Sequence, residues 1–459
     1  MTLGELARVI EGAATDRAGS AAARFESVST DSRTLAPGAL FVALRGPRFD
    51  GHDHAGQAHE RGAAALMVER VLPVDLPQLR VPDTRRALGR AAAHWRSGFS
   101  LPVVAVTGSN GKTTLTQMIA SIFAQAYGQR DGRVAWLATR GNLNNDIGLP
   151  LMLCELAVHH RAAVFELGMN RAGEIAELAR MAQPTLAVVN NAQREHQEFL
   201  ASPEATAREN GAVLTALAPQ GIAVFPADDA CAPIWRDLAG LRRVIDFALD
   251  GPATVTGEHR PVAGGSRIRI STAAGPIDTS LAVPGAHNVH NALAAAACCL
   301  GLGLAPEAIG AGLAAFRAVP GRGTRQATAH GAIVIDDSYN ANPDSVRAAI
   351  DLLAGERPPR LLVLGDMGEV GPQGPAFHRE VGAYAKERGI ESLLALGPLS
   401  RDAVAAFGPG ARHFDDVEAL IGAARPLLAA GGAVLVKGSR FMRMERVVRA
   451  ISGAGADGH

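Results

Sequence analysis

The run from Val103 to Thr114 constrains the fold of this chain more than any other feature. Its first half is apolar and predicts a buried β-strand, which passes straight into a turn that contains Gly108 and Gly111. Such a turn lets successive backbone N–H groups converge on phosphate oxygens, and the helix expected over Leu115 to Phe123 would present its positive N-terminus to the same anion. The expected nucleotide-binding residues are Gly108, Ser109, Asn110, Gly111, Lys112, Thr113 and Thr114.

Two side chains at the end of this turn carry the chemistry that a triphosphate needs. Lys112 is expected to reach the β- and γ-phosphates, and Thr113 is expected to hold Mg²⁺ through its hydroxyl. The match to the usual P-loop pattern is incomplete, because Val106 stands where that pattern has its first glycine. The alternative, an ordinary turn between a strand and a helix, gives no reason for a Lys-Thr-Thr sequence at the helix start. The run therefore predicts a site for a nucleoside triphosphate and Mg²⁺.

Composition excludes several classes of protein. At about 150 residues per domain, 459 residues predict three domains, and 47% hydrophobic residues can fill separate cores. Lysine plus arginine and aspartate plus glutamate both number 45, so no basic field attracts a nucleic acid. The longest apolar stretch, Ala292 to Leu304, is shorter than the ~20 residues of a membrane span. We therefore expect neither a nucleic-acid partner nor a membrane span.

The cysteines and the N-terminus favour a cytoplasmic protein. Cys154, Cys231, Cys298 and Cys299 show neither metal-ligand spacing nor a disulfide framework, and they are interpreted as small buried side chains. Met1 to Glu11 has the pattern of an amphipathic helix and lacks the basic and apolar segments of a signal peptide. The expected location is therefore the cytoplasm, and a monomer is expected.

The order of apolar and polar segments predicts an α/β fold with three domains. They are a small N-terminal α/β domain over residues 1–98, a central P-loop ATPase domain with a mostly parallel sheet over 99–318, and a C-terminal doubly wound, Rossmann-like domain over 319–459. Alternating stretches between Val255 and Pro284 predict antiparallel strands at the edge of the central sheet. Other strands are expected near residues 39–44, 63–68, 162–167, 185–190, 332–335, 360–364, 392–396 and 433–436, and a helix is expected over 84–97.

Polar residues follow two of the central strands where these strands end. Glu166 ends one strand, and Asn190 and Asn191 end the next, with His196 shortly after them. Parallel sheets bind ligands at the carboxyl ends of their strands, so we expect Glu166 and His196 beside the phosphates, as catalytic and Mg²⁺-binding groups. A helix-capping glutamate and a loop histidine are the alternatives for each residue alone. Beside Lys112 the metal site is favoured, because ATP chemistry needs a metal on its phosphates.

Further candidate nucleotide contacts lie later in the chain. Arg322, between two glycines, suits a mobile phosphate clamp, although most isolated arginines are simply solvated. Asn288 and Asn291 lie at the start of an expected helix. They could contact a nucleobase edge or cap the helix, and the sequence leaves both possibilities open.

These motifs together resemble the Mur ligases of peptidoglycan synthesis, most closely the MurF type. The likeness covers nearly the whole chain. Asp31 to Arg33 with Pro37 to Gly46 is similar to the domain that holds the uridine-diphosphate end of the substrate, and the P-loop with Gly141 to Pro150 is similar to the central ATPase domain. The segments that resemble the domain admitting the amine are Asp336 to Pro343, Gly365 to Gly371 and Val436 to Glu445.

The resemblance implies an ATP-dependent ligase that joins UDP-N-acetylmuramoyl-tripeptide to D-alanyl-D-alanine through an acyl phosphate, releasing ADP and phosphate. Such a reaction supplies cell-wall precursors in the cytoplasm and so serves cell shape and cell division. Whether the tripeptide ends in diaminopimelate or lysine stays open. The alternatives are another Mur-type or folylpolyglutamate-type ligase with a different amine acceptor, and a binding protein that uses its P-loop as a nucleotide switch.

The resemblance also implies roles for single residues. The implied catalytic residues are Lys112, Glu166 and His196, and the implied Mg²⁺ ligands are Thr113, Glu166 and His196. Besides the P-loop, the residues implied in nucleotide binding are Asn288, Asn291, Arg322 and Asp337. The residues implied in substrate binding are Ser32 and Arg33 for the uridine-diphosphate end, Asn144, Asn145 and Asp146 for the peptide, and Asp366, Ser439 and Arg440 for the dipeptide.

One position departs from the family pattern. The family usually has a lysine at the place of Asn210, fourteen residues after His196, and a carbamate on that lysine holds the second Mg²⁺. Asparagine cannot form a carbamate, so the ligation of a second metal is open. Glu209 and a water molecule held by Asn210 are the candidate substitutes.

Overall fold

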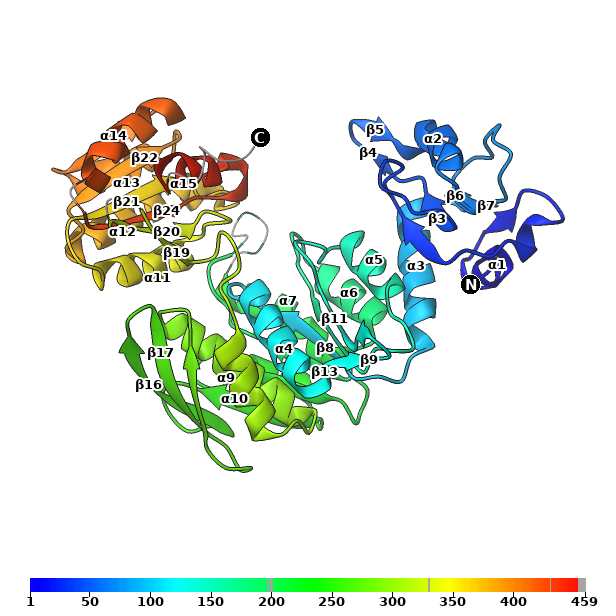
Figure 1. Ribbon diagram of the computed structural model, residues 1–459, viewed down its shortest axis with the longest axis horizontal. Helices are drawn as coiled ribbons and strands as arrows, with labels where there is room; N and C mark the ends of the chain where they lie inside the picture. Colours follow the sequence, from blue (N-terminus) through cyan, green and yellow to red (C-terminus); the bar gives the residue numbers. More distant parts are fainter. Residues whose placement is uncertain (196–197, 199, 201, 329–330, 430, 453–459) are drawn as a thin grey trace.

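The computed structural model describes residues 1–195, 198, 200, 202–328, 331–429 and 431–452, and these residues form three domains, each built on one large sheet. In Figure 1 the N-terminal domain (blue) and the C-terminal domain (yellow to red) lie on opposite sides of the view, both above the central domain (cyan to green). No helix in this part of the chain combines the length and hydrophobicity needed to span a bilayer. The predicted three-domain α/β fold is confirmed.

The N-terminal domain has a five-stranded sheet covered by short helices. Its elements are α1 (Leu3–Val9), β1 (Ala14–Thr15), β2 (Ser27–Ser29), β3 (Ala39–Val42), β4 (Arg45–Gly46), β5 (Phe49–Asp50), α2 (Ala55–Glu60), β6 (Ala65–Val68), β7 (Gln78–Arg80) and α3 (Thr84–Ser97). The sheet has the order β1-β7-β6-β3-β2, and only β1 runs antiparallel to its neighbour. Asp83 caps α3 by accepting a hydrogen bond from the backbone N–H of Arg86, so α3 has the bounds predicted for it.

The central domain has a nine-stranded sheet with helices on both faces. Its sheet strands are β8 (Val103–Thr107), β11 (Trp136–Ala138), β12 (Ala162–Glu166), β13 (Leu186–Val189), β14 (Ile222–Pro226), β15 (Arg243–Ala248), β16 (Val255–Val262), β17 (Gly265–Ser271) and β18 (Ile277–Leu281), and β9 (Gln129–Arg130) and β10 (Arg133–Val134) form a separate hairpin. Its helices are α4 (Lys112–Tyr127), α5 (Gly148–Cys154), α6 (Glu174–Ala182), α7 (Pro203–Thr215), α8 (Ala232–Ala239), α9 (Ala286–Gly301) and α10 (Pro306–Ala315).

The order β11-β12-β8-β13-β14-β15-β16-β17-β18 places β8 between β12 and β13, and the pairs up to β16 are parallel. Successive residues of β8 enter two different cores: Val104 and Val106 pack with α4, α9 and α10, whereas Val103 and Ala105 pack with α5 to α8. The antiparallel pairs β16–β17 and β17–β18 form the sheet edge. This confirms the edge predicted from the alternating pattern.

The C-terminal domain has a six-stranded sheet in the order β19-β20-β24-β21-β22-β23. Its elements are β19 (Thr324–Ala327), β20 (Ile333–Asp337), α11 (Pro343–Ala354), β21 (Arg360–Gly365), α12 (Gly374–Glu387), β22 (Ser392–Leu396), α13 (Ser400–Phe407), β23 (Ala411–Phe414), α14 (Val417–Ala429), β24 (Ala433–Lys437) and α15 (Glu445–Ser452). Separate cores on the two faces of the sheet confirm the doubly wound architecture.

Two strands of this sheet were not predicted from the sequence. The edge strands β19 and β23 are four residues each and carry polar or basic side chains between their apolar ones, so no apolar run marks them.

All four cysteines are free thiols. Cys231, Cys298 and Cys299 are buried as predicted, whereas Cys154 is only partly buried, at the end of α5.

Candidate active site

Two glycines shape the turn after β8. Gly108 and Gly111 have φ angles of +130° and +80°, which favour glycine. A side chain would also clash: a Cβ on Gly108 would lie 3.0 Å from the backbone nitrogen of Asn190, and one on Gly111 would lie 2.5 Å from Oδ1 of Asn291. Val106, at the place of the usual first glycine, is fully buried in β8. The compact loop therefore begins only at Gly108.

Lys112 starts α4, and its ammonium is held inside the loop. Its Nζ donates to the backbone oxygens of Gly108 (2.6 Å) and Ser109 (3.2 Å) and forms an ion pair with Glu195 (3.0 Å). The side chains of Lys112 and Glu195 are only 15% and 11% exposed. The cation thus lies at the place where phosphate oxygens would enter, with a carboxylate beside it.

Glu166, at the end of β12, is joined directly to the P-loop helix. Its Oε2 accepts a hydrogen bond from the hydroxyl of Thr113 (2.8 Å), and its Oε1 accepts one from the amide of Asn144 (2.7 Å). The backbone N–H of Glu166 donates to the hydroxyl of Thr139 (2.9 Å). The carboxylate is 2% exposed. The structure therefore brings together three residues that the sequence predicts for metal and peptide binding.

His196, the third predicted metal ligand, lies outside the described residues. Among the residues that are described, no group of three or more histidine, cysteine, aspartate or glutamate side chains is arranged to hold a metal ion. The candidate metal site therefore rests on Thr113 and Glu166.

A cavity of about 960 Å³ collects most of the predicted site residues from two domains. It lies between the P-loop and the segments that follow β20 and β24 of the C-terminal sheet. The predicted residues that line it are Ser109, Asn110, Gly111, Lys112, Thr113, Thr114, Asn144, Asn145, Glu166, Asn288, Asn291, Arg322, Asp337, Ser439 and Arg440. Neither the central domain nor the C-terminal domain forms this cavity alone.

Asn288 and Asn291 do not cap α9, which has no side-chain cap. The amide of Asn288 donates to the backbone oxygen of Pro284 (2.7 Å). Asn291 is 4% exposed and accepts a hydrogen bond from the amide of Asn190 (2.7 Å), which also donates to the backbone oxygen of Asn110 in the P-loop (2.8 Å). This excludes the capping alternative and shows that Asn291 supports the loop.

Arg322 and Arg440 lie over the same aromatic ring. Their guanidinium carbons are 4.2 Å and 5.6 Å from the ring centroid of Tyr339. Lys437, which lines the same cavity, is 3% exposed and forms an ion pair with Asp337 (2.5 Å). Stacking on an aromatic face holds a guanidinium without consuming its hydrogen-bond donors. Two cations are thus presented to the cavity.

Two of the predicted dipeptide residues support loops of the C-terminal domain. Ser439 is 4% exposed, and its hydroxyl accepts from the backbone N–H of Gly368 (2.7 Å) and donates to the backbone oxygen of Ala341 (3.1 Å). Asp366 is also buried, and its carboxylate accepts from the backbone N–H groups of Ser400 (2.7 Å) and Leu399 (3.2 Å) at the start of α13. Asp366 therefore stabilises a helix terminus, and its contact with the dipeptide stays a prediction.

Two residues of the predicted peptide group have partners within the protein. The carboxamide oxygen of Asn145 accepts from the backbone N–H of Gly148 (2.8 Å), at the start of α5. Asp146 forms an ion pair with Arg85 of α3, with Nη2 and Oδ1 2.6 Å apart. This pair ties the central domain to the helix that ends the N-terminal domain.

Ser32 and Arg33 lie in the N-terminal domain and do not line the 960 Å³ cavity at the P-loop, which we call the main cavity. The Ser32 hydroxyl donates to Oε1 of Gln57 (2.6 Å). The exposed Arg33 side chain donates through Nε (2.9 Å) and Nη2 (2.8 Å) to the two oxygens of Asp31. These hydrogen bonds from Arg33 lower the pKa of Asp31 to about 2. Asp31 therefore stays ionised at neutral pH and orients the guanidinium.

Asn210 and Glu209 lie on α7, and both bind backbone groups in other parts of the central domain. The carboxamide oxygen of Asn210, which is 1% exposed, accepts the backbone N–H of Gly108 (2.9 Å). The Glu209 carboxylate accepts from the backbone N–H groups of Gly173 (2.9 Å) and Ile175 (3.0 Å), at the start of α6. Asn210 therefore holds the P-loop, and Glu209 is engaged at a helix terminus, which argues against Glu209 as a substitute metal ligand.

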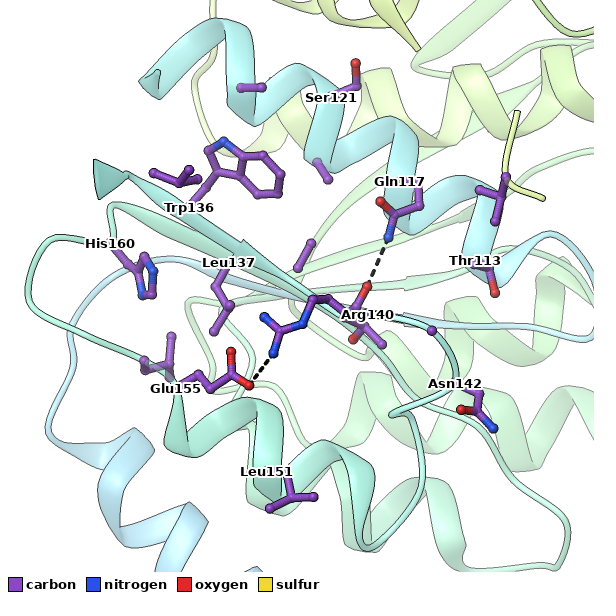
Figure 2. Close-up of a pocket in the computed structure, with 18 of the residues that line it drawn as sticks. Thr113, Gln117, Ser121, Trp136, Leu137, Arg140, Asn142, Leu151, Glu155 and His160 are labelled. Atoms are coloured by element: carbon purple, nitrogen blue, oxygen red, sulfur yellow. Dashed lines mark hydrogen bonds and ion pairs between the residues drawn. The ribbon is translucent and has the colours of Figure 1, made fainter. Parts of the chain in front are cut away.

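A second cavity, of about 1620 Å³, leads from the N-terminal domain to the P-loop. Residues 26–28 of the N-terminal domain line one part of it, and Thr113 lines both cavities. Figure 2 shows Arg140 extending toward Glu155, with which it forms an ion pair, and Gln117 donating from α4 to the backbone oxygen of Thr139 (3.0 Å). A long substrate could therefore reach from one domain to the phosphate site.

His378 supports the loop after β21, and the sequence showed no sign of this role. It is fully buried in α12, its Nε2 accepts the backbone N–H of Met367 (3.0 Å), and its Nδ1 lies 2.7 Å from the backbone oxygen of Gly374. These partners require the neutral ring that carries its proton on Nδ1. Burial lowers the pKa of His378.

This lowered pKa predicts how stability depends on pH. The pKa of this histidine is about 6.5 in the unfolded chain and lower in the folded protein. As the pH falls below 6.5, the unfolded chain binds a proton at His378 and the folded protein does not, so the free energy of unfolding decreases. The slope for one proton is about 1.4 kcal/mol per pH unit. We expect the midpoint of thermal unfolding to fall between pH 7 and pH 5, and to fall less in His378→Gln, whose amide can replace both hydrogen bonds. Equal slopes in the two proteins would contradict this role.

Comparison with protein families gives three matches along the chain. A model described as the Mur ligase family, catalytic domain, matches residues 24–96. The Mur ligase middle domain matches residues 106–299, and the Mur ligase, glutamate ligase domain, matches residues 321–440. The three matches follow the three sheets in order.

Curated relatives match over nearly the whole chain. UDP-N-acetylmuramoyl-tripeptide–D-alanyl-D-alanine ligase of Escherichia coli (strain K12) is 43% identical over 93% of this chain and 93% of its own length. The protein of the same name from Bacillus subtilis (strain 168) is 33% identical over 92% of each chain.

Solved structures agree with these relatives. MurF from Acinetobacter baumannii superimposes with a TM-score of 0.90 at 31% identity, covering 98% of both chains. The MurF ligase of Thermotoga maritima, solved in complex with ADP, gives a TM-score of 0.82 at 25% identity over 94% of this chain and 97% of that one. Folylpolyglutamate synthase of Mycobacterium tuberculosis, at 18% identity and a TM-score of 0.66 over 82% of this chain and 95% of that one, shares only the fold.

Proposed function

This chain belongs to the Mur ligase family and is of the MurF type, and from that premise we propose that it uses ATP to join UDP-N-acetylmuramoyl-tripeptide to D-alanyl-D-alanine. The observation that carries the proposal is the meeting of Lys112, Thr113 and Glu166 in one cavity with Arg322 and Arg440. A P-loop alone would serve a switch protein equally well. The buried Glu166 carboxylate accepts a hydrogen bond from Thr113 of the P-loop, and Arg322 and Arg440 reach the cavity from across the domain boundary. These additional groups fit a ligase that uses ATP to activate the carboxylate of its substrate.

The residues around Glu166 fit a magnesium ion. Its buried carboxylate is bonded to a hydroxyl and an amide, both neutral, and within the described part of the chain no lysine or arginine forms an ion pair with it. A buried carboxylate without a cationic partner is costly, and hard oxygen donors suit Mg²⁺. Thr113 and Glu166 would hold the ion, with His196 as the proposed third ligand. The bound ion would neutralise charge on the phosphates.

The chemistry follows from the weak electrophilicity of a carboxylate. An oxygen of the tripeptide carboxylate attacks the γ-phosphorus, the bond to the β-phosphate oxygen breaks, and ADP leaves. The free amine of the dipeptide then attacks the acyl phosphate carbon, phosphate leaves as the carbonyl is restored, and the nitrogen loses one proton to solvent. In this proposal Lys112 stabilises charge on the transferred phosphoryl group, and Arg322 contacts the nucleotide from the C-terminal domain.

The three domains divide the substrates among them. We propose boundaries at 1–98, 99–318 and 319–459, which the separate sheets support. The N-terminal domain would hold the uridine-diphosphate end near Ser32 and Arg33. The cavity of Figure 2 offers the peptide a path to Thr113, and its position between residues 26–28 and the P-loop supports this route. The dipeptide would enter beside Arg440.

The test supplies ATP, UDP-N-acetylmuramoyl-tripeptide and one amine at a time, and it measures phosphate release and the mass of the product. We expect release only with D-alanyl-D-alanine, and we expect ¹⁸O from the tripeptide carboxylate to appear in the phosphate. Turnover with glutamate instead would favour a folylpolyglutamate-type ligase. Nucleotide binding without turnover on any amine would favour the switch protein.

Location and assembly belong to the same proposal. The precursor carries a nucleotide made inside the cell, so we place the reaction in the cytoplasm, and we propose that the enzyme acts as a monomer.

A further inference from the structure

Arg194 joins the loop after β13 to two helices of the C-terminal domain. Its guanidinium donates to the carboxylates of Asp344 on α11 (2.6 Å) and Glu380 on α12 (2.7 Å), and its backbone N–H also donates to Asp344 (2.9 Å). The same guanidinium lies 5.3 Å from the ring centroid of Phe377. Five side-chain hydrogen bonds link this one residue to the neighbouring domain.

This contact is stronger than an ordinary surface ion pair. The side chains of Arg194, Asp344 and Glu380 are only 24%, 23% and 33% exposed. A planar guanidinium that binds two carboxylates through several hydrogen bonds loses less to solvent and to side-chain entropy than a single exposed pair does. The hydrogen bonds that Arg194 donates to Glu380 and Asp344 raise the pKa of its guanidinium. The contact therefore fixes the loop to the C-terminal domain.

The next residue, Glu195, contacts the central domain instead, through the P-loop residue Lys112. An ammonium has three donors, and those of Lys112 are met by Gly108, Ser109 and Glu195. Two of these acceptors are backbone oxygens of the loop itself. Glu195 is the acceptor that a phosphate can replace, because a phosphate repels a carboxylate placed 3.0 Å from the same cation.

A second contact joins the P-loop to α11, the helix that carries Asp344. Asn110 and Asn342 exchange amide hydrogen bonds, at 2.9 Å from Asn342 to Asn110 and at 3.4 Å in return. Asn342 also caps α11, whose first turn carries Asp344. The start of α11 is therefore held both by the P-loop and by the residue beside Glu195.

We propose that Arg194 and Glu195 form a latch that couples nucleotide arrival at Lys112 to the position of the C-terminal domain. Phosphates that bind Lys112 displace Glu195, and the displacement is transmitted through one peptide bond to Arg194 and its partners on α11 and α12. Both are positioning residues that act through Lys112 and through the domain contact. The inference rests on the proposed nucleotide site at Lys112, and coupling of this kind acts equally in both directions.

The test measures ADP affinity by calorimetry and ATP kinetics by phosphate release. Glu195→Gln should bind ADP about fivefold more tightly and show a lower KM for ATP without a higher kcat, because the competing charge is gone. Arg194→Met should also tighten ADP binding, because it frees the loop to move. In the double variant the two effects should not add, since both release the same latch.

Arg347→Met is the matched control, because Arg347 contacts the same Glu380 (3.3 Å) from within the C-terminal domain and forms no hydrogen bond or ion pair with the described residues of the loop. It should leave ADP affinity unchanged. Unaltered ADP affinity in Glu195→Gln, additive effects in the double variant, or an equal gain in Arg347→Met would each overturn the latch while leaving the ligase assignment intact. Failure of the unmodified enzyme to bind ADP would overturn the nucleotide site and the latch with it.

Discussion

Replacing Lys112 with alanine should abolish ligation, lowering kcat/KM by about a thousandfold or more. The lysine supplies the positive charge that the P-loop places where the γ-phosphate would lie. Folding should be nearly unchanged, because the ammonium bonds to two loop oxygens and to Glu195 and packs into no hydrophobic core. The measurement is phosphate release with both substrates present, together with the midpoint of thermal unfolding.

Lys386→Ala is the control for this substitution. Lys386 lies in α12, where its ammonium donates to the backbone oxygen of Pro409 (3.1 Å) and is 4.9 Å from the ring centroid of Phe407. Its removal should leave turnover unchanged. A Lys112→Ala enzyme that turns over at the normal rate would disprove the phosphate role of the loop.

The second large effect is expected at Glu166. Glu166→Gln keeps the size of the side chain, but the negative charge is lost. Its amide oxygen can still accept from Asn144, and its NH₂ group can donate to the Thr113 hydroxyl, which then acts as the acceptor. We expect kcat to fall by about a hundredfold or more and the dependence of the rate on Mg²⁺ concentration to weaken. ADP binding measured without Mg²⁺ should be unchanged, because Lys112 and the loop N–H groups are intact.

Glu177→Gln is the matched control, since Glu177 is an exposed glutamate on α6 of the same domain. Glu177→Gln should unfold at the same temperature as the parent protein, and Glu166→Gln should unfold at the same or a higher temperature, because it removes a buried charge that has no cationic partner among the described residues. An unchanged Mg²⁺ dependence in Glu166→Gln would remove Glu166 from the metal site and leave Thr113 without its proposed partner.

Local sequence carried most of the information about the P-loop. Gly108 and Gly111 are needed for backbone angles that few other residues adopt, and Lys112 and Thr113 follow them at a spacing of a few residues. Glu166 was also predictable, because a polar residue at the end of a buried parallel strand reaches the same sheet edge as the loop. In these cases the chemistry and the geometry both come from neighbouring residues or from the period of a strand.

The sequence did not reveal the distant partners of two carboxylates, Asp366 and Glu209. Asp366 stands in a loop of the expected type, yet its carboxylate binds the start of α13, more than thirty residues away in the chain. Glu209 likewise caps α6. Nothing near either residue reveals these partners, because a carboxylate can bind backbone N–H groups, a metal or a substrate with the same oxygens.

The sequence by itself determined the three-domain α/β architecture, the place of the nucleotide loop and the kinds of side chain at the strand ends. Backbone conformation and the burial of apolar faces specify these features over short stretches of chain. Only the tertiary structure decided which polar groups meet: Arg194 with Asp344, 150 residues later, and Asn110 with Asn342, 232 residues later. Such pairs depend on how two separately folded domains pack together, and no local periodicity in a sequence records that packing.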